Sequence, residues 1–297
     1  MSLSTAQQYR LSIFCLLFAA SMWGFIWYPM RLFEAAGLPV VWATLLIYVS
    51  AAVMQLPQAF RGPWPWRQLP LDLLWLALAA GLTNLSFLVA LIEGEVMRVM
   101  LLFYLAPLWS VILGRWWLGE KLSGKAMLLL LLAMTGTLIM LWQPEIGLPW
   151  PHGLADWLAL FAGIMFAVNN VLSRKLADVP MHIKTTVVYW GVVLVSLLVI
   201  MLRGSELPAV SWTVSLLAII FGGIAIIAMT ITVLYGLARL PVYRAAVIML
   251  FELVVAAVSA WLLTDEVMRA ADWWGGLLII AAAYGVARIE GRQQSLT

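Results

Sequence analysis

The sequence predicts an all-α integral membrane protein, with ten transmembrane helices arranged as two inverted five-helix repeats around a central cavity. Three observations predict this fold: the composition, ten apolar runs of spanning length, and a likeness between the two halves of the chain. Of the 297 residues, 65% are hydrophobic and 10% are charged, and the mean hydropathy is +1.01. Soluble domains stay near about 45–50% apolar residues, so the excess apolar surface must face lipid.

The apolar runs define the expected helices. A helix needs about 20 apolar residues to cross the roughly 30 Å hydrocarbon core of a bilayer. The first run follows Arg10 and continues to Pro29 without a small-residue cleavage site, so we expect a retained helix rather than a secretory signal. Charge, proline and glycine clusters separate the others. The ten expected helices span 11–30, 38–59, 71–92, 97–117, 124–143, 154–173, 184–202, 212–236, 243–264 and 272–288.

The connections between these runs are short, which leaves no room for a soluble domain. They include Arg61-Gly-Pro-Trp-Pro after the second run, Pro144 to Pro151 after the fifth, and Arg203-Gly-Ser-Glu after the seventh. The seventh run departs most from the pattern because it opens with Lys184 and two threonines. Tryptophans concentrate near the expected helix ends, where their amphipathic rings anchor at the membrane interface. These are Trp64, Trp66, Trp116, Trp117, Trp150, Trp212, Trp273 and Trp274.

The distribution of basic residues predicts the orientation, because cytoplasmic loops carry an excess of Lys and Arg. With the N-terminus inside, thirteen of the 17 basic residues fall on the cytoplasmic side. Four remain outside: Arg31, Arg98, Arg203 and Arg269. This bias favours two cytoplasmic termini and an even number of spans. The only cysteine, Cys15, lies inside the first apolar run, so disulfides and thiolate metal clusters are excluded.

The two halves of the chain resemble each other at a nearly constant offset. A shift of 146 residues places Arg98 on Arg244, Pro107 on Leu253 and Glu120 on Glu266, and a shift of 143 pairs Arg31 with Arg174. We therefore expect two repeats, residues 1–143 and 144–297. A repeat of five helices inserts its second copy upside down, and inverted repeats give transporters two arrangements with alternating access to one midplane site.

Three motifs in the first half resemble the EamA repeat of the drug/metabolite transporter superfamily. They are Met22-Trp23-Gly24, Leu105-Ala-Pro107-Leu-Trp-Ser-Val and Leu118-Gly-Glu120-Lys-Leu-Ser followed by Gly136. The second half keeps Glu266 but has Leu253 in place of the proline and Phe166-Ala167 in place of the Trp-Gly pair. The resemblance covers residues 11–290. It implies a ten-helix carrier of the bacterial inner membrane that exports amino acids or other amphipathic metabolites, with an aromatic amino-acid exporter as the structural prototype.

Glu252 is the one ionisable residue deep inside an expected helix. It lies eight residues after Arg244, which is about 12 Å along a helix. A carboxyl there is costly unless it faces a wet cavity, has a partner or stays protonated. One interpretation is a site carboxyl that meets a substrate ammonium or a transported proton. The other is a neutral Glu that hydrogen-bonds to a neighbouring helix.

Amides and hydroxyls in other helices are further candidates for the site. Asn169 and Asn170 share a stripe with Phe166 and Ser173 in the sixth helix, and Asn84 and Thr230 lie midway along the third and eighth. An amide in lipid must find a partner and therefore points inward. These residues either hold helices together or contact the substrate.

Aromatic residues form a third group of candidates. Trp23 and Trp27 lie one turn apart on the first helix, and Phe103 and Tyr104 precede Pro107 on the fourth. They either pack towards lipid or form a cage for an amphipathic ligand, since aromatic walls bind apolar groups and cations alike. Pro107 is expected to kink its helix and to take part in gating.

Other classes of function are weaker. A polytopic membrane enzyme acting on lipid-linked substrates is the alternative, but acidic residues are sparse at each face and the two histidines, His152 and His182, lie in or beside loops. A channel would need filter-like repeats or rings of charge, which the sequence lacks. We expect no catalytic activity, no cofactor, no metal, no nucleic acid and no obligate protein partner. The expected partners are a small-molecule substrate and membrane lipid.

Overall fold

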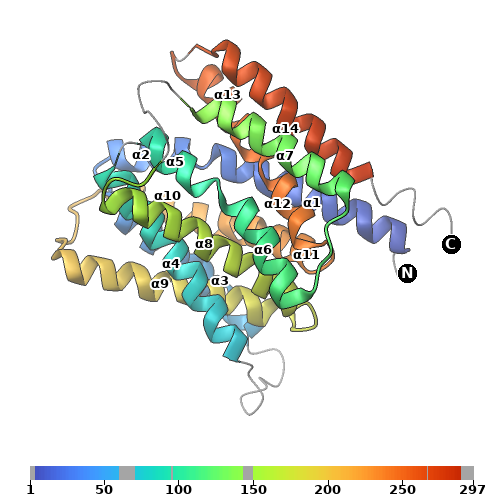
Figure 1. The fold of residues 1–297 in the computed structure, drawn as a ribbon. Helices are drawn as coiled ribbons and strands as arrows, with labels where there is room; N and C mark the ends of the chain where they lie inside the picture. Colours follow the sequence, from blue (N-terminus) through green and yellow to red (C-terminus); the bar gives the residue numbers. More distant parts are fainter. Residues whose placement is uncertain (1–3, 60–70, 95, 143–149, 266, 289–297) are drawn as a thin grey trace.

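A computed structural model describes residues 4–59, 71–94, 96–142, 150–265 and 267–288 (Figure 1). These residues form helices and their connections only. Ten of the helical segments are long and apolar enough to cross a membrane, which confirms the predicted fold class. The helices are α1 Thr5–Phe25, α2 Trp27–Ala35, α3 Val40–Ala59, α4 Leu71–Glu93, α5 Val96–Phe103, α6 Ala106–Leu118, α7 Gly124–Leu141, α8 Leu154–Lys175, α9 Met181–Arg203, α10 Trp212–Phe221, the π-helical segment η2 Gly222–Ile226, α11 Ile227–Leu237, α12 Val242–Met249, α13 Phe251–Leu263 and α14 Ala270–Arg288.

The seventh span is a regular helix despite its polar start. Lys184 is buried at the first turn of α9, and its Nζ donates a hydrogen bond to the Leu176 carbonyl at 3.0 Å. Thr185 Oγ1 donates to Gln55 Oε1 at 2.9 Å, and Thr186 Oγ1 donates to the His182 carbonyl at 2.7 Å. The polar groups are therefore satisfied within the protein, as an apolar surrounding requires.

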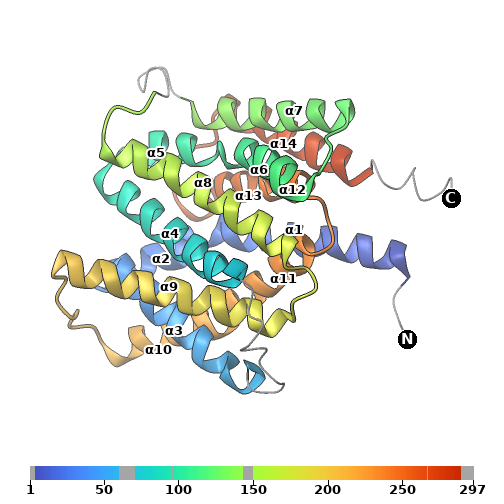
Figure 2. The same ribbon diagram turned by 60° about the horizontal axis from the view of Figure 1, so that its bottom comes forward.

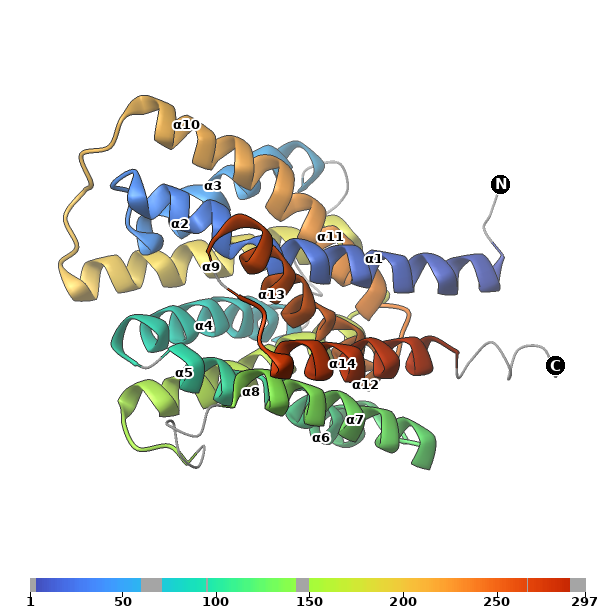
Figure 3. The same ribbon diagram turned by 90° about the horizontal axis from the view of Figure 1, so that it is seen from above.

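Corresponding helices of the two halves of the chain pack against corresponding neighbours. Helix α1 packs on α11 and α13, and its counterpart α8 packs on α4 and α6. Helices α7 and α14 lie side by side at one edge of the bundle, and α3 contacts α9 at the other (Figure 2). The first residue of α1 and the last of α14 lie at the same end of the bundle, which we call the terminal end (Figure 3).

Two spans are broken at corresponding positions. Helix α5 ends at Phe103 and α12 ends at Met249, which are 146 residues apart, and α6 and α13 have 13 residues each. At both breaks the chain tightens into an i to i+3 hydrogen bond, from Leu108 N–H to the Leu105 carbonyl and from Leu253 N–H to the Leu250 carbonyl. The offset found in the sequence thus also relates the helix breaks.

Proline explains only the first of these breaks. Pro107 lies at the start of α6 and has no N–H to donate to the carbonyl four residues earlier. The second break occurs at Leu250, and Leu253 stands where the first half has Pro107. Packing of α12 and α13 against α1 and α14 must therefore maintain the second break.

Tryptophans at the helix ends are exposed, as interfacial anchors should be. Those with at least 49% of their surface accessible are Trp116, Trp117, Trp150, Trp212, Trp273 and Trp274. Trp64, Trp66 and Glu266 lie outside the described residues. The structure thus supports the interfacial interpretation for six of the eight tryptophans.

Candidate functional site

The two helix breaks face each other and enclose a small pocket. Glu252 is the eleventh residue of the 22-residue span Val242–Leu263, so it lies about 15 Å from either end of that span. Four predicted site residues line the pocket, namely Phe103, Tyr104, Pro107 and Glu252. Free space inside it is about 10 Å³, close to the least that holds one water molecule.

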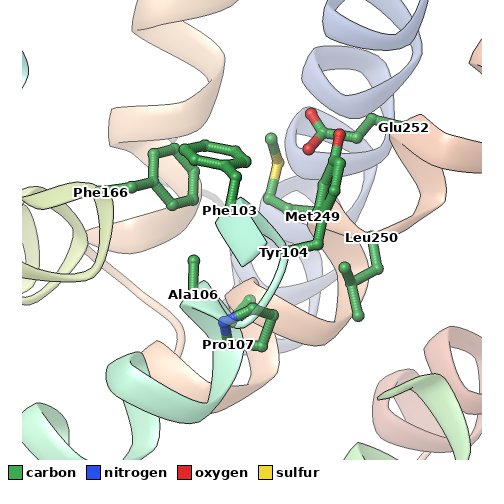
Figure 4. Close-up of a pocket in the computed structure, with 9 residues that line it drawn as sticks. Phe103, Tyr104, Ala106, Pro107, Phe166, Met249, Leu250 and Glu252 are labelled. Carbon is green, nitrogen blue, oxygen red and sulfur yellow. The ribbon is translucent and has the colours of Figure 1, made fainter. Parts of the chain in front are cut away.

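The carboxyl of Glu252 has one polar partner in the pocket. It is hydrogen-bonded to the Tyr104 hydroxyl, which points at it across the gap between α5 and α13 (Figure 4). A break in the helix beside each residue allows this contact. Gly24 on α1 packs on the backbone of Glu252, and a Cβ at Gly24 would overlap the Glu252 carbonyl oxygen. Gly24 of the Trp-Gly pair thus allows α1 to pack closely against the site.

Aromatic rings form the other side of the pocket. The Phe103 ring centroid lies 5.4 Å from that of Tyr104 and 5.6 Å from that of Phe166. Phe87 adds a fourth ring, 4.5 Å from Phe103. Gly163 brings α8 against the Phe103 carbonyl, where a side chain would clash. These distances fall in the range typical of favourable aromatic pairs.

The predicted amides and hydroxyls are in other places. Asn84 forms a hydrogen bond with Tyr48, and Thr230 lies beside the Tyr189 hydroxyl. The rings of Tyr48 and Tyr189 are 6.2 Å apart, so these residues form one polar cluster between α3, α4, α9 and α11. The cluster does not line the pocket. Asn84 Nδ2 also donates to the Ala80 carbonyl at 2.9 Å within its own helix.

The predicted tryptophans also lie outside the pocket lining. Trp27 Nε1 donates a hydrogen bond to Ser259 Oγ at 3.0 Å, which joins α2 to α13 on the side of Glu252 away from the terminal end. Trp23 is partly buried and packs against two apolar clusters, one that includes α3 and α9 and one that includes Ile248 and Met249 of α12. In this conformation the two rings hold α1 and α2 against their neighbours.

Buried polar atoms continue from the pocket towards the terminal end. Among the described residues, Ser110 Oγ on α6 and Asn169 Oδ1 and Ser173 Oγ on α8 are buried without a hydrogen-bond partner. Asn170, beside them, is 3% exposed. Helices α6 and α8 pack directly on each other here. Buried polar atoms are normally paired, so the contact between α6 and α8, which we call the seam, is unusually polar for the interior of a helix bundle.

A carboxylate closes the seam at the terminal end. Glu120, in the connection between α6 and α7, accepts hydrogen bonds from the Val242 N–H at the start of α12, at 2.9 and 3.2 Å. Arg174 Nε of α8 lies 3.8 Å from its Oε1. Burial raises the pKa of Glu120 above its usual value, and the bond from Val242 and the charge of Arg174 oppose this. Glu120 thus joins the first half of the chain to both α8 and α12.

The ten spans, the paired helix breaks and the enclosed carboxyl define a multi-pass membrane protein with a small internal pocket. Comparison with known families shows which kind of membrane protein this is. The sequence model of the EamA-like transporter family matches residues 10–142 and 153–288. The chain therefore belongs to the EamA-like transporter family, and it is a transporter of the drug/metabolite type.

The fold also matches solved structures. A crystal structure of a protein with 20% sequence identity covers 95% of this chain and 98% of its own chain, with a TM-score of 0.73. At this identity the likeness shows the fold alone. No curated protein sequence matches the chain significantly. The expected likeness to an aromatic amino-acid exporter has no named relative to support it, and the membrane-enzyme alternative is not favoured by the family.

Sequence reasoning missed several residues of the pocket. Ala106, Ala246, Met249 and Leu250 line it, as does Phe166, which the sequence places in a polar stripe and at the position of the Trp-Gly pair but not in the site. In an apolar run these residues resemble lipid-facing ones. The only available signal was their position beside Pro107 and Glu252.

Proposed function

We propose that this transporter is a secondary carrier that exports small amphipathic metabolites by alternating access, across the bacterial inner membrane with both termini in the cytoplasm. Amino acids with aromatic or other apolar side chains are the class expected from the sequence. The observation that carries the proposal is the pocket itself: a carboxyl, a tyrosine and aromatic rings enclosed halfway along two broken spans. Such sites at broken helices are common in secondary transporters.

Two inverted halves supply the two states that alternating access needs. Two observations support this arrangement: α1 packs on α11 and α13 as α8 packs on α4 and α6, and the helix breaks lie 146 residues apart. An inward-facing state would separate α6 from α8 and α12 and wet the seam that contains Ser110 and Ser173. The Glu120 contacts would break in that step. An outward-facing state would instead separate α2 from α13 and break the bond between Trp27 and Ser259.

Glu252 is the residue at which substrate export is coupled to proton entry in this proposal. It is the one carboxyl in the pocket lining. A proton and a cationic substrate group would compete for its carboxylate. With Glu252 protonated, the substrate-free carrier would change back to the other state without an unpaired charge in its pocket. A carrier that only equilibrates its substrate, without proton exchange, is the alternative that the following test distinguishes.

The test is transport in proteoliposomes with an imposed proton gradient. Substrate accumulation by the unsubstituted chain should follow the gradient, and Glu252→Gln should lose the dependence while keeping counterflow of substrate. Glu93→Gln, which removes an exposed carboxyl paired with Arg203, is the matched control. Gradient-driven accumulation by Glu252→Gln would disprove the coupling role.

The inverted arrangement has its own test. Lys121→Cys and Val267→Cys place single thiols at exposed positions of corresponding connections, in a chain whose Cys15 is replaced by Ser. An impermeant maleimide should label them from opposite sides of the membrane. Labelling of both from one side would refute the inverted repeat.

A further inference from the structure

Charge in the pocket has only one sign. Glu252 is the sole ionisable acid among the residues that line it, and no Lys, Arg or His is among them. Tyr104 provides the only other polar side chain. A substrate that enters the pocket therefore meets one carboxyl, one hydroxyl and otherwise apolar walls.

The basic residues of α5 and α12 bind other groups. Arg98, six residues before Tyr104, donates from Nε to Asp156 Oδ2 at 2.8 Å, and both side chains are at most 12% exposed. Arg244 lies eight residues before Glu252, on the other side of the helix break, and its Nε donates to the Tyr243 hydroxyl at 2.9 Å. Neither supplies a positive charge to the pocket.

The walls suit the apolar part of a cation. Rings of Phe103, Phe166 and Tyr104 and the sulfur of Met249 surround the space beside the carboxyl (Figure 4). Ring faces attract cations within about 6 Å of their centroids, and the Met side chain adapts to irregular shapes. Among the described lining residues no side chain carries a positive charge that could neutralise a negative group.

We propose that the pocket binds organic monocations, meaning ammonium groups attached to an aromatic or apolar body, in preference to zwitterionic amino acids. This proposal deepens the proposed function and rests on it. An ammonium would pair with the Glu252 carboxylate, while Tyr104 orients the carboxylate by its hydrogen bond. The carboxylate of an amino acid would lie next to Glu252 with no basic partner, and burying such a charge unpaired is strongly unfavourable.

Ligands that share one phenyl ring but differ in charge test this directly. Binding of phenethylamine, phenylalanine methyl ester, phenylalanine and 3-phenylpropionate to the purified full-length protein is measured by isothermal titration calorimetry. The first two are cations, and the ester keeps the bulk of the amino acid with its carboxylate blocked. We expect both cations to bind at least tenfold more tightly than phenylalanine, and 3-phenylpropionate to bind most weakly.

Substitutions locate the preference within the protein. Glu252→Gln should reduce the ratio of cation to zwitterion affinity to near one, whereas Glu206→Gln, on an exposed connection, should leave it unchanged. The ligand series uses the unsubstituted chain, so it stands even if Glu252→Gln does not fold. Equal or tighter binding of phenylalanine than of its ester would overturn the proposal, as would the absence of binding by both cations.

Transport measurements test the cation preference separately from the proposed carrier function. If proteoliposomes exchange phenylalanine but not phenethylamine, the chain is a carrier and the cation preference is wrong. If phenethylamine binds through Glu252 but no ligand crosses the membrane, the cation site stands and the carrier function fails. Failure of one proposal is thus distinguishable from failure of the other.

Discussion

Removal of the Glu120 carboxylate should open the seam between α6 and α8. Glu120→Ala deprives the Val242 N–H at the start of α12 of its acceptor and Arg174 of its acidic neighbour. Loss of a helix N-cap costs about 0.5–2 kcal/mol, and a hydrogen bond to a charged group contributes about 1.5–3 kcal/mol. Because these terms overlap, we expect the closed form to lose about 1–3 kcal/mol.

A loss of that size changes the population of the open form by about 5- to 150-fold. The assay is thiol labelling of Ser173→Cys, whose side chain is fully buried in the seam, in a chain with Cys15 replaced by Ser. Labelling from the terminal end should accelerate by that factor when Glu120→Ala is added. Lys175→Ala, which removes the neighbouring exposed ion pair with Asp72, is the matched control and should have little effect.

The result that refutes this reasoning is a labelling rate that Glu120→Ala changes no more than Lys175→Ala does. In that case the contacts of Glu120 with α12 and α8 would contribute nothing to closure. The buried polar atoms of α6 and α8 would then be permanent features of the core rather than the walls of a path. A melting temperature recorded for each variant separates opening of the seam from general unfolding.

Three further predictions concern neighbouring features. Burial raises the pKa of Glu120, so the closed form binds the proton of this carboxyl more tightly than a form in which Glu120 faces water. Labelling of Ser173→Cys should therefore slow as pH falls through the range just above about 4.3, relative to labelling of the same thiol in a Glu120→Gln background. A ratio of the two labelling rates that does not change with pH would contradict this. Gly24→Ala should push α1 away from the Glu252 backbone, reduce the stability of the protein by about 1–3 kcal/mol and lower the initial transport rate at least tenfold. Gly124→Ala, where a Cβ meets no atom within 4 Å, should do neither. Arg98→Ala should leave the buried Asp156 carboxylate without its cationic partner, with only the His152 N–H, among the described residues, donating to it. We expect this to destabilise the protein by about 3–5 kcal/mol, measured by denaturation in detergent; a loss below about 1 kcal/mol would show that the pair is solvated.

The sequence was sufficient for the spans and for the main candidate of the site. Lipid demands about 20 apolar residues per helix, so ten such runs could be counted without a structure. A carboxyl in the middle of an apolar run is equally conspicuous, and Glu252 was recognised for that reason. The offset of 146 residues also emerged from the sequence, because Arg98 and Glu120 stand out against apolar neighbours.

Partners of these residues could not be found in the same way. Tyr104, Phe166 and Met249 share the pocket with Glu252, but an aromatic or methionine that faces a pocket has the same local pattern as one that faces lipid. Trp23 and Asn84 were equally plausible from the sequence and lie in other clusters. The rotation of each helix about its axis decides between these outcomes, and in an apolar helix no polar face reveals that rotation.

The two helix breaks show most clearly which features the sequence conveys and which depend on tertiary packing. Pro107 announces the first break through its missing N–H, a property of one residue that sequence alone conveys. At Leu250 no residue requires a break, and the turn exists because α1 and α14 hold α12 and α13 in place. Local chemistry therefore determined which segments enter the membrane, while contacts between distant helices decided where Glu252 points and what surrounds it.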